Sequence, residues 1–371
     1  MTIHSKSAAS SLDHLRTQID SIDDQIVRLL QDRFGLAQAI REAKASSGQG
    51  VYDPARENAI IQRLTQQLAA QQTALPAVAL HSIYAAIMRE SRSVQAQQQV
   101  AILGPEGSYH HVATLEALGS SQQVLFCGSI TEAFVAVSEG LAGQALVAVE
   151  NSLGGTIGET IDQLWSHDVR VVSEIILPIR HCLIGKGPLA QAKVLLSHPQ
   201  ALAQCSEWIR RNATHLTVQE SASTSAAVEQ ALRNPQCVGI GSELAARLRG
   251  APVLARDLQN SHDNQTRFYV LQSSRIPVSD DPQANRGALM FTLPHRAGAL
   301  ARALDTLAAH ALNLTAIVSR PLAAAPWEYV FLLEVDSPDA AQYQAARAEL
   351  ERNAVHLRDL GRFARVQLRG Q

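Results

Sequence analysis

The stretch DNQTRFYVLQ, residues 263–272, runs from a polar loop into an apolar strand, with Thr266 and Arg267 at the junction. Its apolar half is one of several short runs rich in Val, Ile and Leu between residues 100 and 275, each bounded by Gly, Pro or Ser. Helical stretches alternate with these runs, which predicts an α/β domain with a largely parallel sheet over residues 100–275. The hydroxyl and the guanidinium at the junction either end a loop or belong to a ligand site at the mouth of a cleft.

Length and composition limit the class of protein. A chain of 371 residues exceeds what one hydrophobic core usually serves, so two or three domains are expected. The net charge of −2 offers no large basic face, which argues against nucleic-acid binding. None of the four cysteines forms a C-x-x-C pair, so neither a zinc site nor a redox motif is expected. The lack of a signal-peptide core and of a long apolar run predicts a cytoplasmic protein with no membrane partner.

Two further units flank the α/β domain. Residues 11–96 contain stretches in which apolar residues recur every three or four positions, as they do from Leu12 to Leu29, and this pattern predicts an all-α helical domain. The helical domain is too short to bury much surface alone, so a homodimer or higher homo-oligomer is expected. Residues 286–369 follow the order β-α-β-β-α-β, which predicts a small ferredoxin-like α+β domain.

Cationic side chains lie on the apolar stripe of the helical domain. The spacing that leads to Leu29 places Arg33 on the same face, and Lys44 lies four residues beyond Ile40. An arginine on a buried stripe needs an anionic partner, whereas a snorkelling arginine packs its stem and keeps its head in water. Several cations and few acids that converge inside a helical bundle favour a pocket for a small dianion.

The strings LRTQIDSIDDQIVRLLQDRFGLAQAIREAK (15–44) and VYDPARENAII (51–61) resemble the all-helical chorismate mutases. That family rearranges chorismate to prephenate in a pericyclic reaction, which requires positioning and electrostatic stabilisation rather than a nucleophile. The resemblance implies that the substrate carboxylates are bound by Arg16, Arg33 and Arg56, and that the ether oxygen accepts from Lys44 and Gln95. It also implies that Asp53 and Glu57 meet the substrate hydroxyl and that Ser91 lies in the pocket. Arg16 comes either from the same chain or from a partner chain.

The α/β domain carries the stretches ENSLGG (150–155), SHPQALAQC (197–205), ASTSAA (222–227) and NQTRF (264–268). Each stretch alone is ordinary turn or helix-cap chemistry, but together they resemble the prephenate dehydratases. The resemblance implies two α/β lobes around a cleft, as in two-lobed periplasmic binding proteins. It also implies a reaction that removes water and carbon dioxide from prephenate to give phenylpyruvate.

The same resemblance implies roles within the cleft. Thr266 is the candidate that acts on the ring hydroxyl of prephenate, either as an acid or as a hydrogen-bond donor. Arg267 either binds a substrate carboxylate or locks the loop through an ion pair. The residues that line the cleft are Asn151, Ser152, Gln200, Ser223 and Thr224. His198 and Glu159 are acid–base types that we interpret as structural, and His110 departs from the family pattern and receives no role.

The last domain contains PHRAGALARAL (294–304) and, at residues 319–321, Ser-Arg-Pro. These stretches resemble the phenylalanine-binding motifs of the ACT domain that follows prephenate dehydratases. The resemblance implies an allosteric phenylalanine site, across a dimer interface, formed by Gly298, Ala299, Leu300, Ser319, Arg320 and Pro321. Val318 replaces the family's usual Glu before Ser-Arg-Pro, so the strength of inhibition is left open. The alternative is a ferredoxin-like dimerisation module without a ligand.

Three resemblances in the family's order imply a bifunctional chorismate mutase/prephenate dehydratase that is inhibited by L-phenylalanine and uses no cofactor and no metal. One alternative, a mutase fused to prephenate dehydrogenase, requires a G-x-G-x-x-G turn after a strand, which the sequence lacks. The other alternative is an amino-acid sensor that has lost catalysis, but the retained Thr-Arg-Phe and the mutase cations argue against it. Transfer of prephenate between the sites without release is left open.

Overall fold

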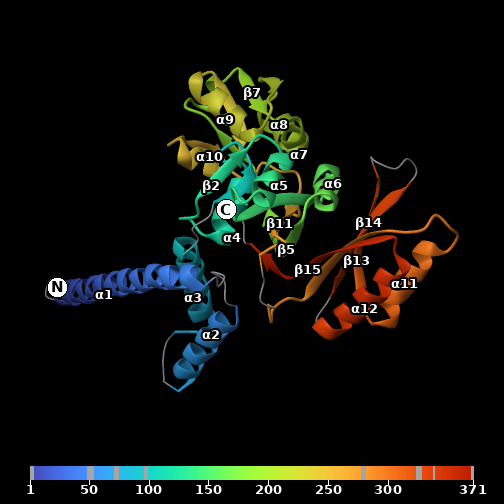
Figure 1. Ribbon diagram of the computed structural model, residues 1–371. Helices are drawn as coiled ribbons and strands as arrows, with labels where there is room; N and C mark the ends of the chain where they lie inside the picture. The colour runs from blue at the N-terminus through green and yellow to red at the C-terminus, as the bar shows by residue number, and fades with distance from the viewer. Residues whose placement is uncertain are drawn as a thin grey trace.

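The computed structural model describes residues 4–47, 54–70, 75–95, 99–276, 281–322, 328–336 and 339–368, with the backbone alone for 4–11, 41–47, 54–55 and 92–95 (Figure 1). A group of N-terminal helices and two β-sheets with their covering helices make up this part of the chain. No helix within it is both long and apolar enough to cross a bilayer.

Three helices form the N-terminal unit: α1 (His4–Ser47), α2 (Pro54–Ala69) and α3 (Ala77–Gln95). α1 extends away from the other units (Figure 1). The apolar stripe that the sequence places on α1 is exposed, with exposed fractions of 50% for Leu12, 52% for Leu15 and 58% for Ile19. A stripe of this period normally faces a core, so one chain alone leaves the expected helical core incomplete.

The first lobe of the central unit is built around β1 (Val100–Leu103), β3 (Gln144–Asn151) and β11 (Gln265–Ser273), strands that are mostly apolar and mostly buried. Its other strands are β2 (Val124–Cys127), β4 (Gly155–Thr156) and β5 (Val169–Pro178). Its helices are α4 (Tyr109–Leu118), α5 (Ile130–Ser138) and α6 (Gly158–Ser166). Serine hydroxyls cap the first turns of α4 and α5.

The second lobe has its own sheet, in the order β10-β6-β9-β7-β8. Its strands are β6 (Cys182–Ile184), β7 (Val194–Ser197), β8 (Thr217–Glu220), β9 (Cys237–Gly241) and β10 (Val253–Ala255). Its helices are η1 (Leu189–Gln191), α7 (Pro199–Gln204), α8 (Ser206–Asn212), α9 (Thr224–Arg233) and α10 (Glu243–Leu248). Two chain segments connect the lobes, one after β5 and one before β11.

The first sheet is mixed, and the prediction of a largely parallel sheet is wrong at its centre. β11 lies antiparallel between β3 and β5, whereas β1 is parallel to both β2 and β3. The chain path is the reason, because the polypeptide leaves the first lobe after β5 and returns from the second lobe as β11. The start of β11 therefore lies beside the end of β3, where Thr266 pairs with Asn151.

The C-terminal unit has the β-α-β-β-α-β order that the sequence predicts. Its elements are β12 (Arg286–Thr292), α11 (Ala299–Ala309), β13 (Asn313–Pro321), β14 (Tyr329–Asp336), α12 (Ala340–Asn353) and β15 (His356–Gln367). The strands follow the order β13-β14-β12-β15, and α11 and α12 cover one face (Figure 1).

The C-terminal sheet continues into the first lobe, a connection that the sequence does not reveal. The first part of β15 pairs with β12, and its last residues, from Ala364 onward, pair in parallel with β5. The face of this sheet opposite its helices shares a core with the first lobe, in which Met290 and Leu332 belong to the same cluster as Phe134 and Ile161. Backbone pairing and apolar packing together fix the C-terminal unit to the central unit.

Candidate active site

Asn151 and Thr266 form the centre of the candidate site, at the end of β3 and the start of β11. The Asn151 amide Nδ2 donates to Thr266 Oγ1 at 3.0 Å and to Asn264 Oδ1 at 2.9 Å. Both side chains are buried, each with 9% exposure. Because the threonine hydroxyl accepts from Asn151, its own proton remains able to donate to a bound ligand.

The loop after Asn151 leads from this pair to a cavity. Asn151 Oδ1 accepts from the amides of Leu153 and Gly154 at 3.1 and 2.9 Å, which fixes the loop. A cavity of about 290 Å³ follows, lined by Leu153, Gly154, Gln200, Ala203, Gln204 and Asn260. A Cβ atom on Gly154 would come within 2.8 Å of the Gln200 amide nitrogen, so the two lobes are in close contact there. Ser152 ties the loop to the strand, because its hydroxyl donates to Asp263 O and accepts from the amide of Gln265.

Gln204 is a cavity residue that the sequence analysis missed. It lies four residues after Gln200 on α7, and residues at this spacing share a helix face, so the quoted motif already contained the signal. His181 Nε2 lies 2.9 Å from Gln204 Oε1, and His181 Nδ1 lies 2.8 Å from the hydroxyl of Tyr109. Burial lowers the pKa of His181, which favours the neutral ring. The Tyr109 hydroxyl also lies 2.8 Å from Arg180 O, to which it can donate its single proton. In the tautomer of His181 that carries its proton on Nε2, the ring donates to Gln204 Oε1, which leaves the Gln204 NH₂ group as a donor.

The remaining predicted cleft residues of the second lobe serve as helix starts. Ser223 caps α9, and its hydroxyl accepts from the amide of Ala226 at 3.0 Å, while Thr224 is the first residue of that helix. His198 caps α7 in the same way, with Nδ1 accepting from the amide of Gln200. These bonds match the helix-cap chemistry that each motif has on its own.

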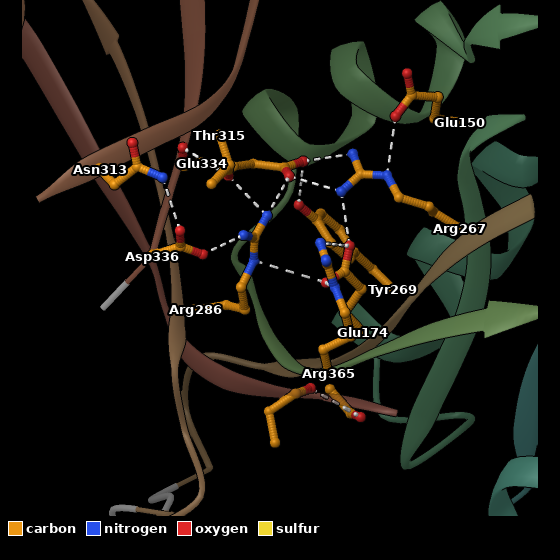
Figure 2. Close-up of polar contacts among 12 residues, drawn as sticks. Glu150, Glu174, Arg267, Tyr269, Arg286, Asn313, Thr315, Glu334, Asp336 and Arg365 are labelled. Atoms are coloured by element: carbon orange, nitrogen blue, oxygen red, sulfur yellow. Dashed lines mark hydrogen bonds and ion pairs between the residues drawn. The ribbon is translucent and has the colours of Figure 1, made fainter. Parts of the chain in front are cut away.

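Arg267 points away from this site, so the structure does not support its predicted binding of a substrate carboxylate. Its guanidinium donates to Glu150 at 2.9 Å, to Glu174 at 2.6 Å and to Glu334 at 2.7 and 2.8 Å (Figure 2). Successive side chains of a strand point to opposite faces, which places Arg267 opposite Thr266. The structure favours the other role expected for Arg267, an ion pair.

Two acid–base side chains near the site have structural surroundings. The ring of His110 packs edge-on against Phe268, with centroids 5.1 Å apart, and burial lowers the pKa of His110 to about 4. Glu159 accepts hydrogen bonds from the backbone and hydroxyl of Thr131 across α6 and α5. The link between α6 and α5 supports the interpretation of Glu159 as structural, and His110 is still assigned no role.

The helical unit brings two of its predicted site residues together. Arg33 of α1 donates to the hydroxyl of Ser91 on α3, which is buried and itself donates to Ile87 O at 2.7 Å. Arg16 is exposed and pairs with Asp13. Arg56 and Glu57 lie in the first turn of α2. Asp53 and the side chains of Lys44 and Gln95 lie outside the described residues.

The predicted effector residues lie at two places in the C-terminal unit. Gly298 has φ of 76° and precedes α11, whose first residues are Ala299 and Leu300. This left-handed conformation is one that glycine adopts without strain. Ser319, Arg320 and Pro321 end β13. The guanidinium of Arg320 is occupied, because it donates to both carboxylate oxygens of Asp162 on α6, at 3.0 and 2.7 Å.

Comparison with known proteins matches the prephenate dehydratase family to residues 100–276 and type II chorismate mutases to residues 15–96. A bifunctional chorismate mutase/prephenate dehydratase of Aquifex aeolicus is 33% identical over 361 residues, covering 96% of this chain and 99% of that protein. A prephenate dehydratase of Arthrobacter aurescens, solved in complex with L-Phe, is 28% identical with a TM-score of 0.67, covering 72% of this chain and 90% of that one. GqqA, described as a novel type of quorum quenching acylase, is 28% identical with a TM-score of 0.66, covering 72% of this chain and 98% of that one.

Proposed function

The chain belongs to the family of bifunctional chorismate mutase/prephenate dehydratases, and we propose that it makes phenylpyruvate from chorismate in phenylalanine biosynthesis, under feedback inhibition by L-phenylalanine. The observation that carries the dehydratase half is the 3.0 Å contact between Asn151 and Thr266. This contact joins strands that are distant in sequence, and it lies next to the loop that lines the cavity.

In the proposed dehydratase reaction, the ring hydroxyl of prephenate leaves as water while the ring carboxylate leaves as carbon dioxide. The electron pair of the carbon–carboxylate bond enters the ring, which becomes aromatic, and the electron pair of the C–O bond leaves with the oxygen. Thr266 donates a hydrogen bond to that oxygen, and a proton from solvent completes the water molecule that leaves. Because negative charge accumulates there as the bond breaks, this hydrogen bond is stronger in the transition state than in the ground state.

Neutral donors supply the rest of the proposed dehydratase site. Asn151 fixes the orientation of the Thr266 hydroxyl, and the amides of Gln200 and Gln204 face the cavity, where they can bind the substrate carboxylates. Ser152 is proposed to shape the entrance loop, and Ser223 and Thr224 to present the start of α9 to the cleft. Arg267 is left out of this set because three carboxylates already occupy its guanidinium.

The mutase half is proposed to lie in the helical unit. Arg33, held by Ser91, is a cation on a largely apolar helix face, where a dicarboxylate would find a partner. The other proposed ligands are Arg16, Lys44, Asp53, Arg56, Glu57 and Gln95. The exposed stripe of α1 supports a homodimer in which a second copy covers it and contributes Arg16.

The C-terminal unit is proposed to be an ACT regulatory domain. Its β-α-β-β-α-β order supports this assignment, as does the Arthrobacter aurescens relative in complex with L-Phe. We propose that the amides at Gly298–Leu300 hold the effector carboxylate at the start of α11 and that Ser319–Pro321 complete the site. The three domains then span residues 11–96, 100–275 and 286–369, and the enzyme is expected to be cytoplasmic.

Assays of the purified full chain on chorismate and on prephenate, each with and without L-phenylalanine, test this proposal. Thr266→Ala should lower kcat for dehydration about 100- to 1000-fold, the effect of removing one transition-state donor, while mutase turnover stays within about twofold of wild type. Thr266→Ser, which keeps the hydroxyl, is the matched control. Lys44→Ala should give the reverse result.

Several outcomes would contradict the assignment. Dehydration near the wild-type rate in Thr266→Ala would remove Thr266 from the mechanism. Turnover of prephenate only in the presence of NAD would indicate a dehydrogenase. No turnover of either substrate, with phenylalanine still bound, would indicate a sensor.

A further inference from the structure

A group of charged side chains with a buried centre and a more exposed rim joins the dehydratase strands to the C-terminal unit. We call it the interdomain cluster, and Figure 2 shows its members. They are Glu150, Glu174, Arg267, Tyr269, Arg286, Glu334, Asp336 and Arg365. β3, β5 and β11 supply one side of the cluster, and β12, β14 and β15 supply the other.

Arg267 is shared between the two units. On the dehydratase side its guanidinium donates to Glu150 and Glu174, and on the C-terminal side it makes a forked pair with both oxygens of Glu334. The side chains of Glu174 and Glu334 are 0% and 2% exposed. A forked pair fixes orientation as well as distance, so a displacement of Glu334 is transmitted to Arg267.

The carboxylates of the cluster are themselves held in place. The Tyr269 hydroxyl donates to Glu334 at 2.6 Å, and Arg365 donates to Glu174 at 2.5 Å. Arg286 reaches Glu334 at 3.4 Å and Asp336 at 2.6 Å. Each buried carboxylate therefore has contacts from both the central and the C-terminal unit, and their positions depend on how the two units dock.

Both charged neighbours of the catalytic pair belong to this cluster. Arg267 follows Thr266 directly, and Glu150 precedes Asn151 directly. The strand pairing is irregular at this point: Arg267 lies opposite Glu150, but Phe268 lies opposite Ala148. Before this bulge, Thr266 pairs with Asn151 and Arg267 with Glu150 in regular register, so Arg267 and Glu150 lie on the face of the cluster while Asn151 contacts Thr266.

We propose that Arg267 is a positioning residue for the dehydratase site and that Glu334 is the contact through which the C-terminal unit controls it. β14, which carries Glu334, pairs with β13, where Ala316 lies opposite Glu334 and the proposed effector residues 319–321 lie opposite residues 329–331. An effector bound at Ser319–Pro321 therefore lies one strand from Glu334. This inference rests on the proposed dehydratase function.

The test compares Glu334→Gln with a matched control, Glu229→Gln, which breaks an exposed Arg–Glu pair on α9. Glu334→Gln should lower kcat for prephenate at least tenfold and leave KM within about twofold, because the cavity residues are unchanged. It should also move the phenylalanine concentration for half-inhibition by at least fivefold, while mutase turnover stays constant. Glu229→Gln should change none of these quantities.

A double-mutant cycle separates positioning from general damage. Arg267→Lys keeps the charge but loses the forked pair with Glu334. Its effect on kcat should not add to that of Glu334→Gln, because both substitutions remove the same interaction. Tyr269→Phe removes a single hydrogen bond to Glu334 without a change of charge, so it should give a smaller loss in the same direction. It serves in place of Glu334→Gln if that variant does not fold.

The results that overturn the inference differ from those that overturn the proposed function. If the wild-type protein turns over prephenate, an unaltered kcat in Glu334→Gln would refute the inference alone. Fully additive effects of Arg267→Lys and Glu334→Gln would do the same. A wild-type protein without dehydratase activity would refute the proposed function and the inference with it.

Discussion

Replacing Arg267 with Met tests how strongly the interdomain cluster stabilises the protein. Removing one partner of a buried ion pair costs about 3–5 kcal/mol. Here Glu174 keeps Arg365, and Glu334 keeps Tyr269 and Arg286, so both carboxylates retain partners after the change. We therefore expect the lower end of that range, about 3 kcal/mol, which corresponds to a drop in Tm of about 6–12 °C for a unit of this size.

Thermal unfolding followed by circular dichroism measures this loss, with Arg233→Met as the control. Arg233 makes an exposed ion pair with Glu229, with side chains 74% and 52% exposed, so its removal should cost less than about 1 kcal/mol. An equal effect of the two substitutions would refute the view that the cluster is a buried and structurally important network.

The loss in Arg267→Met should also depend on pH. Although burial opposes it, hydrogen bonds from Arg267 hold the pKa of Glu334 below its ordinary value in the wild type. The stabilisation is therefore present above the unfolded-state pKa and is lost as the pH falls through the folded-state value. In the variant, Glu334 has lost the hydrogen bonds from Arg267, so we expect burial to bring its pKa above the wild-type value and protonation to remove the buried charge at a higher pH. The difference in Tm should shrink in mild acid, and a difference that stays constant with pH would count against this account.

Three further results are expected. Tyr109→Phe removes the hydroxyl that contacts His181 and should lower dehydratase kcat/KM about tenfold, as one lost hydrogen bond in a buried network predicts; steady-state kinetics would show this, and an unchanged value would mean that the His181 contact does not orient Gln204. Asp162→Asn frees Arg320 and should tighten phenylalanine inhibition by up to about fivefold, because a part-exposed pair is worth about 1 kcal/mol or less; weaker inhibition would contradict the role given to Arg320. Ile19→Asp places a charge on the exposed stripe and should abolish mutase activity and yield monomers in light scattering, whereas an active dimer would show that this stripe is not the interface.

Much of the candidate site was accessible from the sequence because it consists of local motifs. The Thr266 assignment rests on a short string at a strand start and stays a proposal, which the contact of Thr266 with Asn151 supports. Gln204 was within reach too, since it shares a helix face with Gln200. Arg267 could not be assigned in this way, because the sequence does not reveal which face of β11 looks toward the cleft. A shift of one residue reverses that choice.

The sequence by itself determined the helices of the N-terminal unit, the alternating elements of the central unit and the order of the C-terminal unit. These features follow from periodicity and turn residues, which act over a few positions along the chain. The tertiary structure alone decided that β11 runs antiparallel to β3, that β15 crosses from β12 to β5, and that Glu334 meets Arg267. Contacts of this kind join residues far apart in sequence, and they depend on strand order and docking, for which no local pattern carries information.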